Sequence, residues 1–118
     1  RVWLLRKPLN IISMKKAAKF LIGKHDFNSF RSVHCQARSS IKSLKNIEIK
    51  RKQEELRITL TAPSFLHNQV RIIVGTLKMV GEGKIKPKDM LAILKGCDRK
   101  LAGPTAPANG LYFVEAKY

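Results

Sequence analysis

An arginine beside a strongly apolar helical stripe is the clearest sign of chemistry in this sequence. The stripe has apolar side chains at steps of three and four residues, the spacing of one buried helix face. Its members are Val70, Ile73, Val74, Leu77 and Val80. Arg71 lies on the flank of that face, and His67 and Lys78 fall along the same flank. A guanidinium whose stem is packed against a core is held in place, so it can face a cleft and bind an anionic partner.

The charge of the chain indicates a polyanionic partner. Its 118 residues carry 24 Lys and Arg against 8 Asp and Glu, a formal net charge of +16, which is too large a surplus for balanced surface ion pairs. The cations are spread through segments that also carry a core pattern, which favours RNA or DNA over a lipid surface. No apolar run approaches the roughly 20 residues of a membrane span. The start does not read as a signal peptide, so we expect a cytoplasmic protein.

The segment after Asn10 is a second candidate for phosphate contact. Its apolar residues share one predicted helix face, which comprises Ile11, Met14, Ala18 and Leu21. The opposite face carries Lys15, Lys16 and Lys19. Asn10 is a typical helix cap and Gly23 a typical stop, so a basic-faced amphipathic helix is predicted. Two interpretations stay open for its lysines: contact with RNA phosphates, or an ordinary solvated surface.

Signatures of metal binding and nucleophilic catalysis are missing from the sequence. The histidines are scattered, no Cys-x-x-Cys pair occurs, and no serine lies in a Gly-x-Ser-x-Gly elbow. The run 81–84 lacks the leading glycine and the hydroxyl residue of a phosphate-binding loop, so it is interpreted as a helix terminator. Cys35 and Cys97 lack the spacing of a disulfide-stapled domain. Structural roles are expected for the carboxylates of Asp26, Asp89 and Asp98.

The elements that must position these residues follow from periodicity. Alternating apolar residues predict two half-buried strands over 44–50 and 56–62, joined by a charged run as an antiparallel hairpin. Residues 25–43 show no clean period and are expected to form a loop-rich connector. The apolar stripe predicts a long helix after Pro63 that ends near Gly81.

The last third of the chain predicts a shorter helix and a returning strand. Pro87 fits the first position of a helix that ends before Gly96. A turn-rich loop over 103–110 then leads into a strand over 111–114 that is apolar on both faces. Together these elements predict a single α+β domain over 1–118, with helices packed on one face of an antiparallel sheet.

Three ordered stretches of the chain resemble the bacterial tRNA pseudouridine synthase A family. They are GKHDFNSFR at 23–31, FLHNQVRIIVG at 65–75 and DRKLAGPTAPANGLY at 98–112. The resemblance implies a pseudouridine synthase fold and an enzyme that isomerises uridines in the anticodon stem-loop of tRNA. Such an enzyme breaks the C1′–N1 glycosidic bond, turns the base and rejoins it through C5. The resemblance also implies that no cofactor or metal is needed, and that a homodimer presents basic surfaces to tRNA.

The resemblance assigns roles to individual residues. An arginine of the family, matched here by Arg71, pairs with the catalytic aspartate, and a fixed guanidinium would orient that carboxylate and keep it ionised. The leucine of a Gly-Leu-Tyr motif, matched by Leu111, would form an apolar wall beside the flipped-out base. Arg31, which belongs to the first stretch, is an expected RNA contact, and so are His67 and Lys78 from their place on the flank beside Arg71. Arg71 as a surface ion-pair residue and Leu111 as ordinary core remain the alternatives.

One departure from the family pattern has a large consequence. The family's catalytic aspartate, in an Arg-Thr-Asp segment, and its base-stacking tyrosine belong to the amino-terminal half, and neither motif occurs here. The chain resembles the carboxy-terminal half only, so we expect it to be inactive unless the missing half supplies the aspartate. Its start at Arg1 favours a part of a longer polypeptide. The alternatives are a non-catalytic basic RNA-binding module and a dimerisation domain whose charge only aids solubility.

Overall fold

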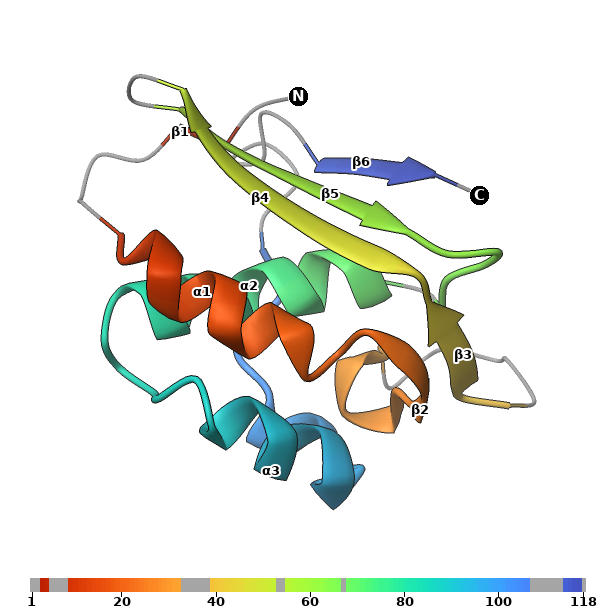
Figure 1. The fold of residues 1–118 in the computed structure, drawn as a ribbon. Helices are drawn as coiled ribbons and strands as arrows, with labels where there is room; N and C mark the ends of the chain where they lie inside the picture. Colours follow the sequence, from red (N-terminus) through yellow and green to blue (C-terminus); the bar gives the residue numbers. More distant parts are fainter. Residues whose placement is uncertain are drawn as a thin grey trace.

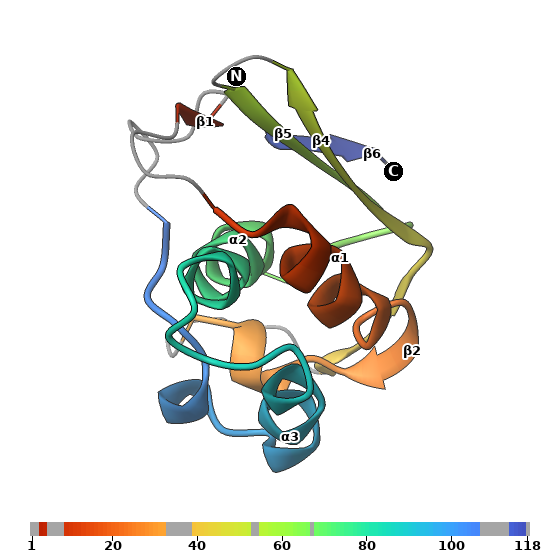
Figure 2. The same cartoon turned by 60° about the vertical axis from the view of Figure 1, so that its left-hand side comes forward.

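The chain folds into a sheet that is covered on one face by helices (Figure 1). The computed structural model describes residues 3–4, 9–32, 39–52, 55–66, 68–106 and 114–117. Two helices, α1 and α2, lie against the sheet, and α3 lies on their far side, as the turned view in Figure 2 also shows. This arrangement agrees with the predicted α+β class and with helices on one face of the sheet.

The predicted hairpin is confirmed. Strands β4 (Asn46–Lys52) and β5 (Glu55–Thr61) pair antiparallel, with Ile49 opposite Ile58. Alternate side chains point into the core, because successive residues of a strand face opposite sides of the sheet. The buried set is Ile47, Ile49, Leu56, Ile58 and Leu60.

The other edge of β5 carries two short strands. β1 (Trp3–Leu4) pairs antiparallel with the start of β5, and β6 (Val114–Lys117) pairs parallel with its end. Parallel neighbours need a long crossover connection, which here contains α2 and α3. The returning strand is therefore parallel to β5, whereas an antiparallel sheet was predicted. It begins at Val114. The predicted strand residues 111–113 lie outside the described residues.

Helix α1 (Ile11–Lys19) forms as predicted at its start but ends earlier than expected. The Asn10 side chain accepts a hydrogen bond from the backbone N–H of Ser13 at 3.1 Å, which is the predicted cap. The helix ends at Lys19, because the backbone N–H groups of the next three residues donate to carbonyls only three residues earlier. This is a tighter, 3₁₀-type turn that starts with the bond from Phe20 to Ala17. Gly23 belongs instead to the next strand, with a φ of +111°.

Helix α2 (Gln69–Gly81) is the centre of the core. Ile72, Ile73 and Leu77 are completely buried, and Val80 nearly so. At its end it packs closely on α1, since a Cβ on Gly81 would lie 2.7 Å from the sulfur of Met14. The predicted helix and its buried stripe are therefore confirmed, apart from a half-buried Val70 at the start.

Helix α3 (Asp89–Gly96) differs from its prediction at both ends. It begins at Asp89 rather than Pro87, because the N–H groups of Asp89, Met90 and Leu91 donate to carbonyls three residues earlier, which makes a tighter turn before the α-helix. The Asp89 carboxylate accepts the backbone N–H of Lys86 at 2.8 Å and closes that turn. Gly96 is its last helical residue, and Cys97 takes the left-handed conformation that ends it, with a φ of +49°.

The predicted connector between 25 and 43 is wrong, because part of this region forms a second sheet. Strands β2 (Gly23–Asp26) and β3 (Ile41–Leu44) pair antiparallel, and the short 3₁₀ helix η1 (Asn28–Phe30) follows β2. The strands are only four residues long and bury few side chains, so they leave no hydrophobic period in the sequence. Phe27 and Phe30 are completely buried beside them.

Candidate functional site

Arg71 holds the segment 103–106 through both its side chain and its backbone. The guanidinium Nε donates to the carbonyl oxygen of Ala106 at 2.8 Å, and the backbone N–H of Ala106 donates to the carbonyl of Arg71 at 3.0 Å. Arg71 lies in the first turn of α2 and is half-buried. We call residues 103–106 the strap, because they lie across α2.

Two glycines allow the strap to approach α2 at backbone distance. A Cβ on Gly75 would overlap the carbonyl oxygen of Pro104, and a Cβ on Gly103 would lie 2.9 Å from the Cα of Thr76. Real Cβ atoms do not approach other atoms so closely, so any larger residue would push the strap away from the helix. Close backbone approach is a typical use of glycine.

Side-chain hydrogen bonds hold the strap from both sides. On the side of α2, the Thr76 hydroxyl accepts the backbone N–H of Gly103 at 2.9 Å and donates to the carbonyl of Ile72 at 2.8 Å. On the other side, Arg99 donates from Nη1 to the carbonyl of Gly103 at 2.9 Å and from Nη2 to the hydroxyl of Thr105 at 3.2 Å. The partner of Arg71 is therefore part of a firmly bonded segment.

The terminal nitrogens of the Arg71 guanidinium are candidates to bind a ligand. Within the part of the chain that the structure describes, Nη1 and Nη2 of Arg71 have no hydrogen bond, and no carboxylate forms an ion pair with it. A guanidinium fixed at Nε still presents donors in one plane, which is the geometry that binds a carboxylate or phosphate through two oxygens. The predicted alternative of an ion-pair residue has no partner among the described residues.

A hollow of about 280 Å³ adjoins the strap and α2. It is lined by backbone and side chains of both, including Lys78 and Met79 from the helix and Thr105 and Ala106 from the strap. Lys78 is half-buried. Lys78 therefore lies on the same helix as Arg71, and it lines the same hollow as Ala106, whose carbonyl Arg71 binds.

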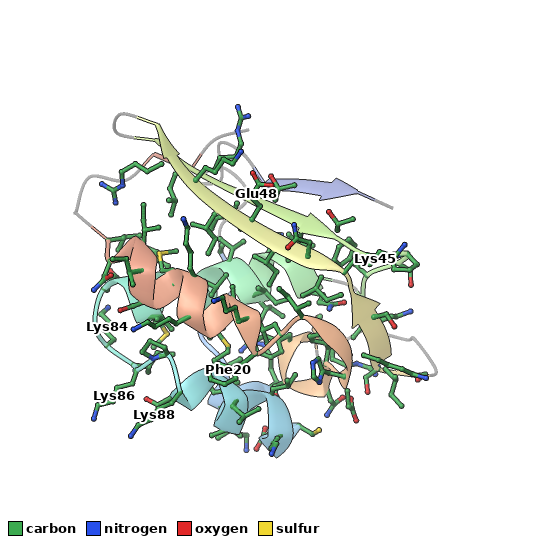
Figure 3. The ribbon with its side chains drawn as sticks, in the orientation of Figure 1. Phe20, Lys45, Glu48, Lys84, Lys86 and Lys88 are labelled. Atoms are coloured by element: carbon green, nitrogen blue, oxygen red, sulfur yellow. The ribbon has the colours of Figure 1, made fainter. Side chains whose placement is uncertain are left out.

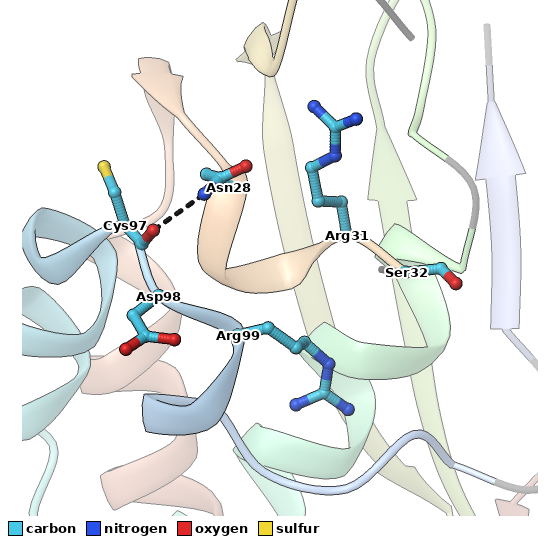
Figure 4. A pocket seen from close by; sticks show the side chains of 6 residues that line it. All are labelled: Asn28, Arg31, Ser32, Cys97, Asp98 and Arg99. Atoms are coloured by element: carbon cyan, nitrogen blue, oxygen red, sulfur yellow. Dashed lines mark hydrogen bonds between the residues drawn. The ribbon is translucent and has the colours of Figure 1, made fainter. Parts of the chain in front are cut away.

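A second, larger hollow of about 420 Å³ lies where the first and third family-like stretches meet (Figure 4). Its lining comprises Asn28, Arg31, Ser32, Cys97, Asp98 and Arg99. The Asn28 amide donates to the carbonyl of Cys97, the residue just before the third stretch, at 2.7 Å, as drawn in Figure 4. Arg31 and Arg99 both contribute positive charge to this hollow, which suits an anionic ligand.

The thiol of Cys97 is held in its protonated form. Partial burial raises its pKa above the ordinary value of 9.0, and the neighbouring Asp26 raises it further through its negative charge and a hydrogen bond. The thiolate, rather than the thiol, is the nucleophile in cysteine chemistry. Cys97 is therefore a poor nucleophile at neutral pH, although it lines a hollow.

Asp26, Asp89 and Asp98 have the structural roles that were predicted, because each carboxylate accepts a backbone N–H of a turn. Asp26 accepts the backbone N–H of Asn28 at 3.1 Å and a hydrogen bond from the Ser40 hydroxyl. Asp98 accepts the backbone N–H of Lys100 at 3.0 Å. Among the described residues, no three His, Cys, Asp or Glu side chains gather as they would around a metal ion. None of the described helices is long and apolar enough to span a bilayer.

The remaining predicted contacts are dispersed. Lys15, Lys16 and Lys19 are exposed on the outer face of α1. His67 and Leu111 lie outside the described residues. Figure 3 shows three further lysines that sequence reasoning missed, on the loop between α2 and α3: Lys84, Lys86 and Lys88. Alternation of lysine with Ile85 and Pro87 was the only signal for them in the sequence.

Arg99 and Thr76 are the site residues that sequence reasoning missed. In the sequence, Arg99 is only the residue next to Asp98, and Thr76 is a polar residue within the apolar helix. Their role depends on the strap, which is brought to α2 by tertiary packing. The family-like stretch 98–112 was the only signal that pointed to this region.

Comparison with known proteins identifies the family. A family model described as tRNA pseudouridine synthase matches residues 17–118. Proteins named tRNA pseudouridine synthase A from Allorhizobium ampelinum and Rhizobium meliloti are both 49% identical to the chain over all of its 118 residues, and that of Agrobacterium fabrum is 48% identical. The chain covers 46%, 48% and 44% of these relatives, respectively, so it spans less than half of their length. The resemblance in the three stretches is thereby confirmed: the chain belongs to the tRNA pseudouridine synthase family.

Proposed function

We propose that this chain is the carboxy-terminal half of an enzyme that isomerises uridine to pseudouridine in the anticodon stem-loop of tRNA. The observation that carries the proposal is Arg71, which is fixed at Nε by the strap and has no hydrogen bond from Nη1 or Nη2 to any of the described residues. Family membership and the partial coverage of the relatives support the same conclusion. A catalytic half that supplies a carboxylate to this arginine completes the site.

The proposed reaction is an isomerisation and needs no co-reactant. The C1′–N1 bond breaks, the base turns, and a C1′–C5 bond forms, while C5 gives up its proton and N1 gains one. The aspartate for this chemistry belongs to the missing amino-terminal half. Arg71 would bind that aspartate through its terminal nitrogens, orient it and favour its ionised form.

Leu111 is proposed as the apolar wall beside the target base. It follows the strap by five residues in the chain. Exclusion of water around a flipped-out base strengthens the electrostatic interactions of the reacting groups. The two roles would thus be linked through one short length of backbone.

The basic residues are proposed to bind the phosphates of tRNA. Lys15, Lys16 and Lys19 form an exposed face on α1, and Arg31 lines the larger hollow. Lys78, on the same helix as Arg71, and His67 are proposed as further contacts. Neutralisation of phosphates by Lys and Arg releases counterions, so binding should weaken steeply with salt. We also propose a homodimer that works in the cytoplasm, where its substrate is found.

The test uses tRNA in which uridine is tritiated at C5, because formation of the C1′–C5 bond releases that hydrogen to water. The full-length protein should release tritium and place pseudouridine in the anticodon stem-loop. This chain alone should release none, and addition of the separately expressed amino-terminal half should restore activity. Release by the chain alone would show that the missing aspartate is not required.

A second candidate function is a non-catalytic RNA-binding module. The net charge of +16 and the exposed lysines of α1 favour it as far as binding is concerned. The same experiment separates the two functions. Full-length protein that binds tRNA yet releases no tritium would support the binding module and refute the synthase.

A further inference from the structure

Arg99 contacts the strap at two points and thereby fixes the segment that holds Arg71. It opens the short 3₁₀ helix η2 (Arg99–Leu101), and its side chain is half-buried. Its two terminal nitrogens bind the carbonyl of Gly103 and the hydroxyl of Thr105. Because the guanidinium is planar and rigid, these bonds set the position of both strap residues together.

The residue that Arg99 binds is next to the residue that Arg71 binds, so loss of the Arg99 hydrogen bonds would affect the position of Ala106. Thr105, which Arg99 binds, directly precedes Ala106, whose carbonyl accepts the Nε–H of Arg71. On the opposite side, two side chains of α2 bind the strap: the Thr76 hydroxyl accepts the N–H of Gly103, and Arg71 itself donates to the carbonyl of Ala106. Among the described residues, Arg99 provides the only hydrogen bonds to the strap that come from outside α2.

We propose that Arg99 is a positioning residue for Arg71 and acts through the strap. The proposal rests on the proposed role of Arg71 in binding the catalytic carboxylate. Loss of the Arg99 bonds would let the Ala106 carbonyl shift and would release the Nε anchor of Arg71. A misplacement of about 1 Å at a catalytic group can cost about 100-fold in rate, so an arginine that never touches the substrate can still control the chemical step.

The rival role for Arg99 is direct contact with an RNA phosphate, because it also lines the hollow of about 420 Å³. The two roles predict different kinetics. A phosphate contact contributes to tRNA binding and changes KM, whereas a positioning residue changes kcat. The two hydrogen bonds that Arg99 already gives to the strap favour positioning.

The kinetic test is Arg99→Lys in the full-length protein. Lysine keeps the charge but cannot bind both strap oxygens in one plane. We expect kcat to fall by about 10- to 100-fold and KM for tRNA to stay within about twofold. The matched control is Lys100→Ala, which removes an exposed charge from the adjacent residue and should leave kcat unchanged. A raised KM with normal kcat, or no change at all, would overturn the proposal.

A direct readout follows the Nε–H of Arg71 itself by NMR of the full-length protein without tRNA. Its hydrogen bond to Ala106 should slow exchange of this proton with water. Arg99→Lys should speed that exchange by at least about tenfold, and Lys100→Ala should not. Exchange that stays equally slow in Arg99→Lys would refute the positioning role, whatever the kinetics.

A milder variant and an arginine control keep the test decisive. Thr105→Val removes one of the two acceptors of Arg99, so it should change kcat and Nε–H exchange in the same direction but less, even where Arg99→Lys does not fold.

Arg71→Lys tests the proposed function separately. If Arg71→Lys leaves kcat unchanged, the proposed role of Arg71 fails, and the exchange measurement still decides whether Arg99 positions it.

Discussion

Ser29 and Asp98 are joined by a partly buried hydrogen bond that ties the first family-like stretch to the third. The Ser29 hydroxyl accepts the backbone N–H of Asp98 at 2.8 Å and donates to the carbonyl of Ile93 at 2.7 Å. Ile93 lies in the last turn of α3, where carbonyls have no partner within the helix. One hydroxyl therefore satisfies the end of α3 and sets the start of the segment that leads to Arg99.

Replacement of this hydroxyl should destabilise the protein. Ser29→Ala leaves the N–H of Asp98 and the carbonyl of Ile93 without their partner, and such a loss costs about 1–3 kcal/mol in free energy of unfolding. Urea denaturation of the full-length protein measures it. Ser43→Ala is the control, because Ser43 is exposed in β3, and its effect should stay within about 0.5 kcal/mol. Equal effects of the two variants would contradict this account of Ser29.

Gly75 should be intolerant of any side chain. In Gly75→Ala the new Cβ overlaps the Pro104 carbonyl, so either α2 or the strap must move, at a cost of about 1–3 kcal/mol. The displaced strap should also lower kcat. Gly96→Ala is the matched helical control, because its Cβ would meet only the end of the Leu101 side chain, which is 50% exposed and can rotate away. Gly75→Ala should therefore unfold at a lower temperature and release tritium more slowly than Gly96→Ala.

The contrast between α2 and the strap shows what the sequence could and could not predict. The helix was predictable because its apolar residues repeat at the helical period over three turns, and the hairpin because Ile47 to Leu60 alternate. The bond between Arg71 and Ala106 joins residues 35 apart in the chain. No local period encodes such a contact, which arises from packing of a loop against a helix already formed.

Exposed elements were the other blind spot. Strands β2 and β3 bury almost none of their side chains, with only Leu44 fully inside, so no alternation marks them. The start of α3 was misplaced for a related reason. Pro87 has the backbone geometry of a first helical residue, but the turn closed by Asp89 delays the helix. Resemblance to a family found the site region where periodicity could not.

The lysine face of α1 should contribute to the salt dependence of tRNA binding. A triple variant that changes Lys15, Lys16 and Lys19 to glutamine should weaken binding and flatten the slope of log K against log salt. The charge-matched control changes the loop lysines shown in Figure 3, Lys84, Lys86 and Lys88. A smaller effect of the α1 variant than of the loop variant would mean that the α1 face is merely solvated.

Cys97 should resist alkylation until high pH. Because its pKa is raised above 9.0, chiefly by burial and then by Asp26, iodoacetamide should modify it more slowly at pH 9 than it modifies an unhindered thiol. Asp26→Asn keeps an acceptor oxygen but removes the negative charge, so it should lower the pKa of Cys97 and speed alkylation. Mass spectrometry of the peptide that contains Cys97 follows the reaction. Unchanged alkylation in Asp26→Asn would exclude the electrostatic contribution.

The same thiol gives a pH dependence of stability with a definite sign. Folded Cys97 keeps its proton above the pKa of the unfolded chain, so the unfolded state binds fewer protons in that range. Stability should therefore be fully present below about pH 9 and fall as the pH rises through the raised folded pKa. Denaturation of Cys97→Ser, compared with the parent protein across this range, should remove that part of the decline.

The most direct test of the whole account is Arg71→Ala in the full-length protein, assayed for both tRNA affinity and tritium release. We predict that kcat falls by about 100-fold or more, while the Kd for tRNA stays within about twofold, because the lost interaction acts on the catalytic carboxylate and not on the RNA. A normal kcat with a Kd weakened in proportion to the loss of kcat/KM would show that Arg71 binds phosphate and would contradict the account.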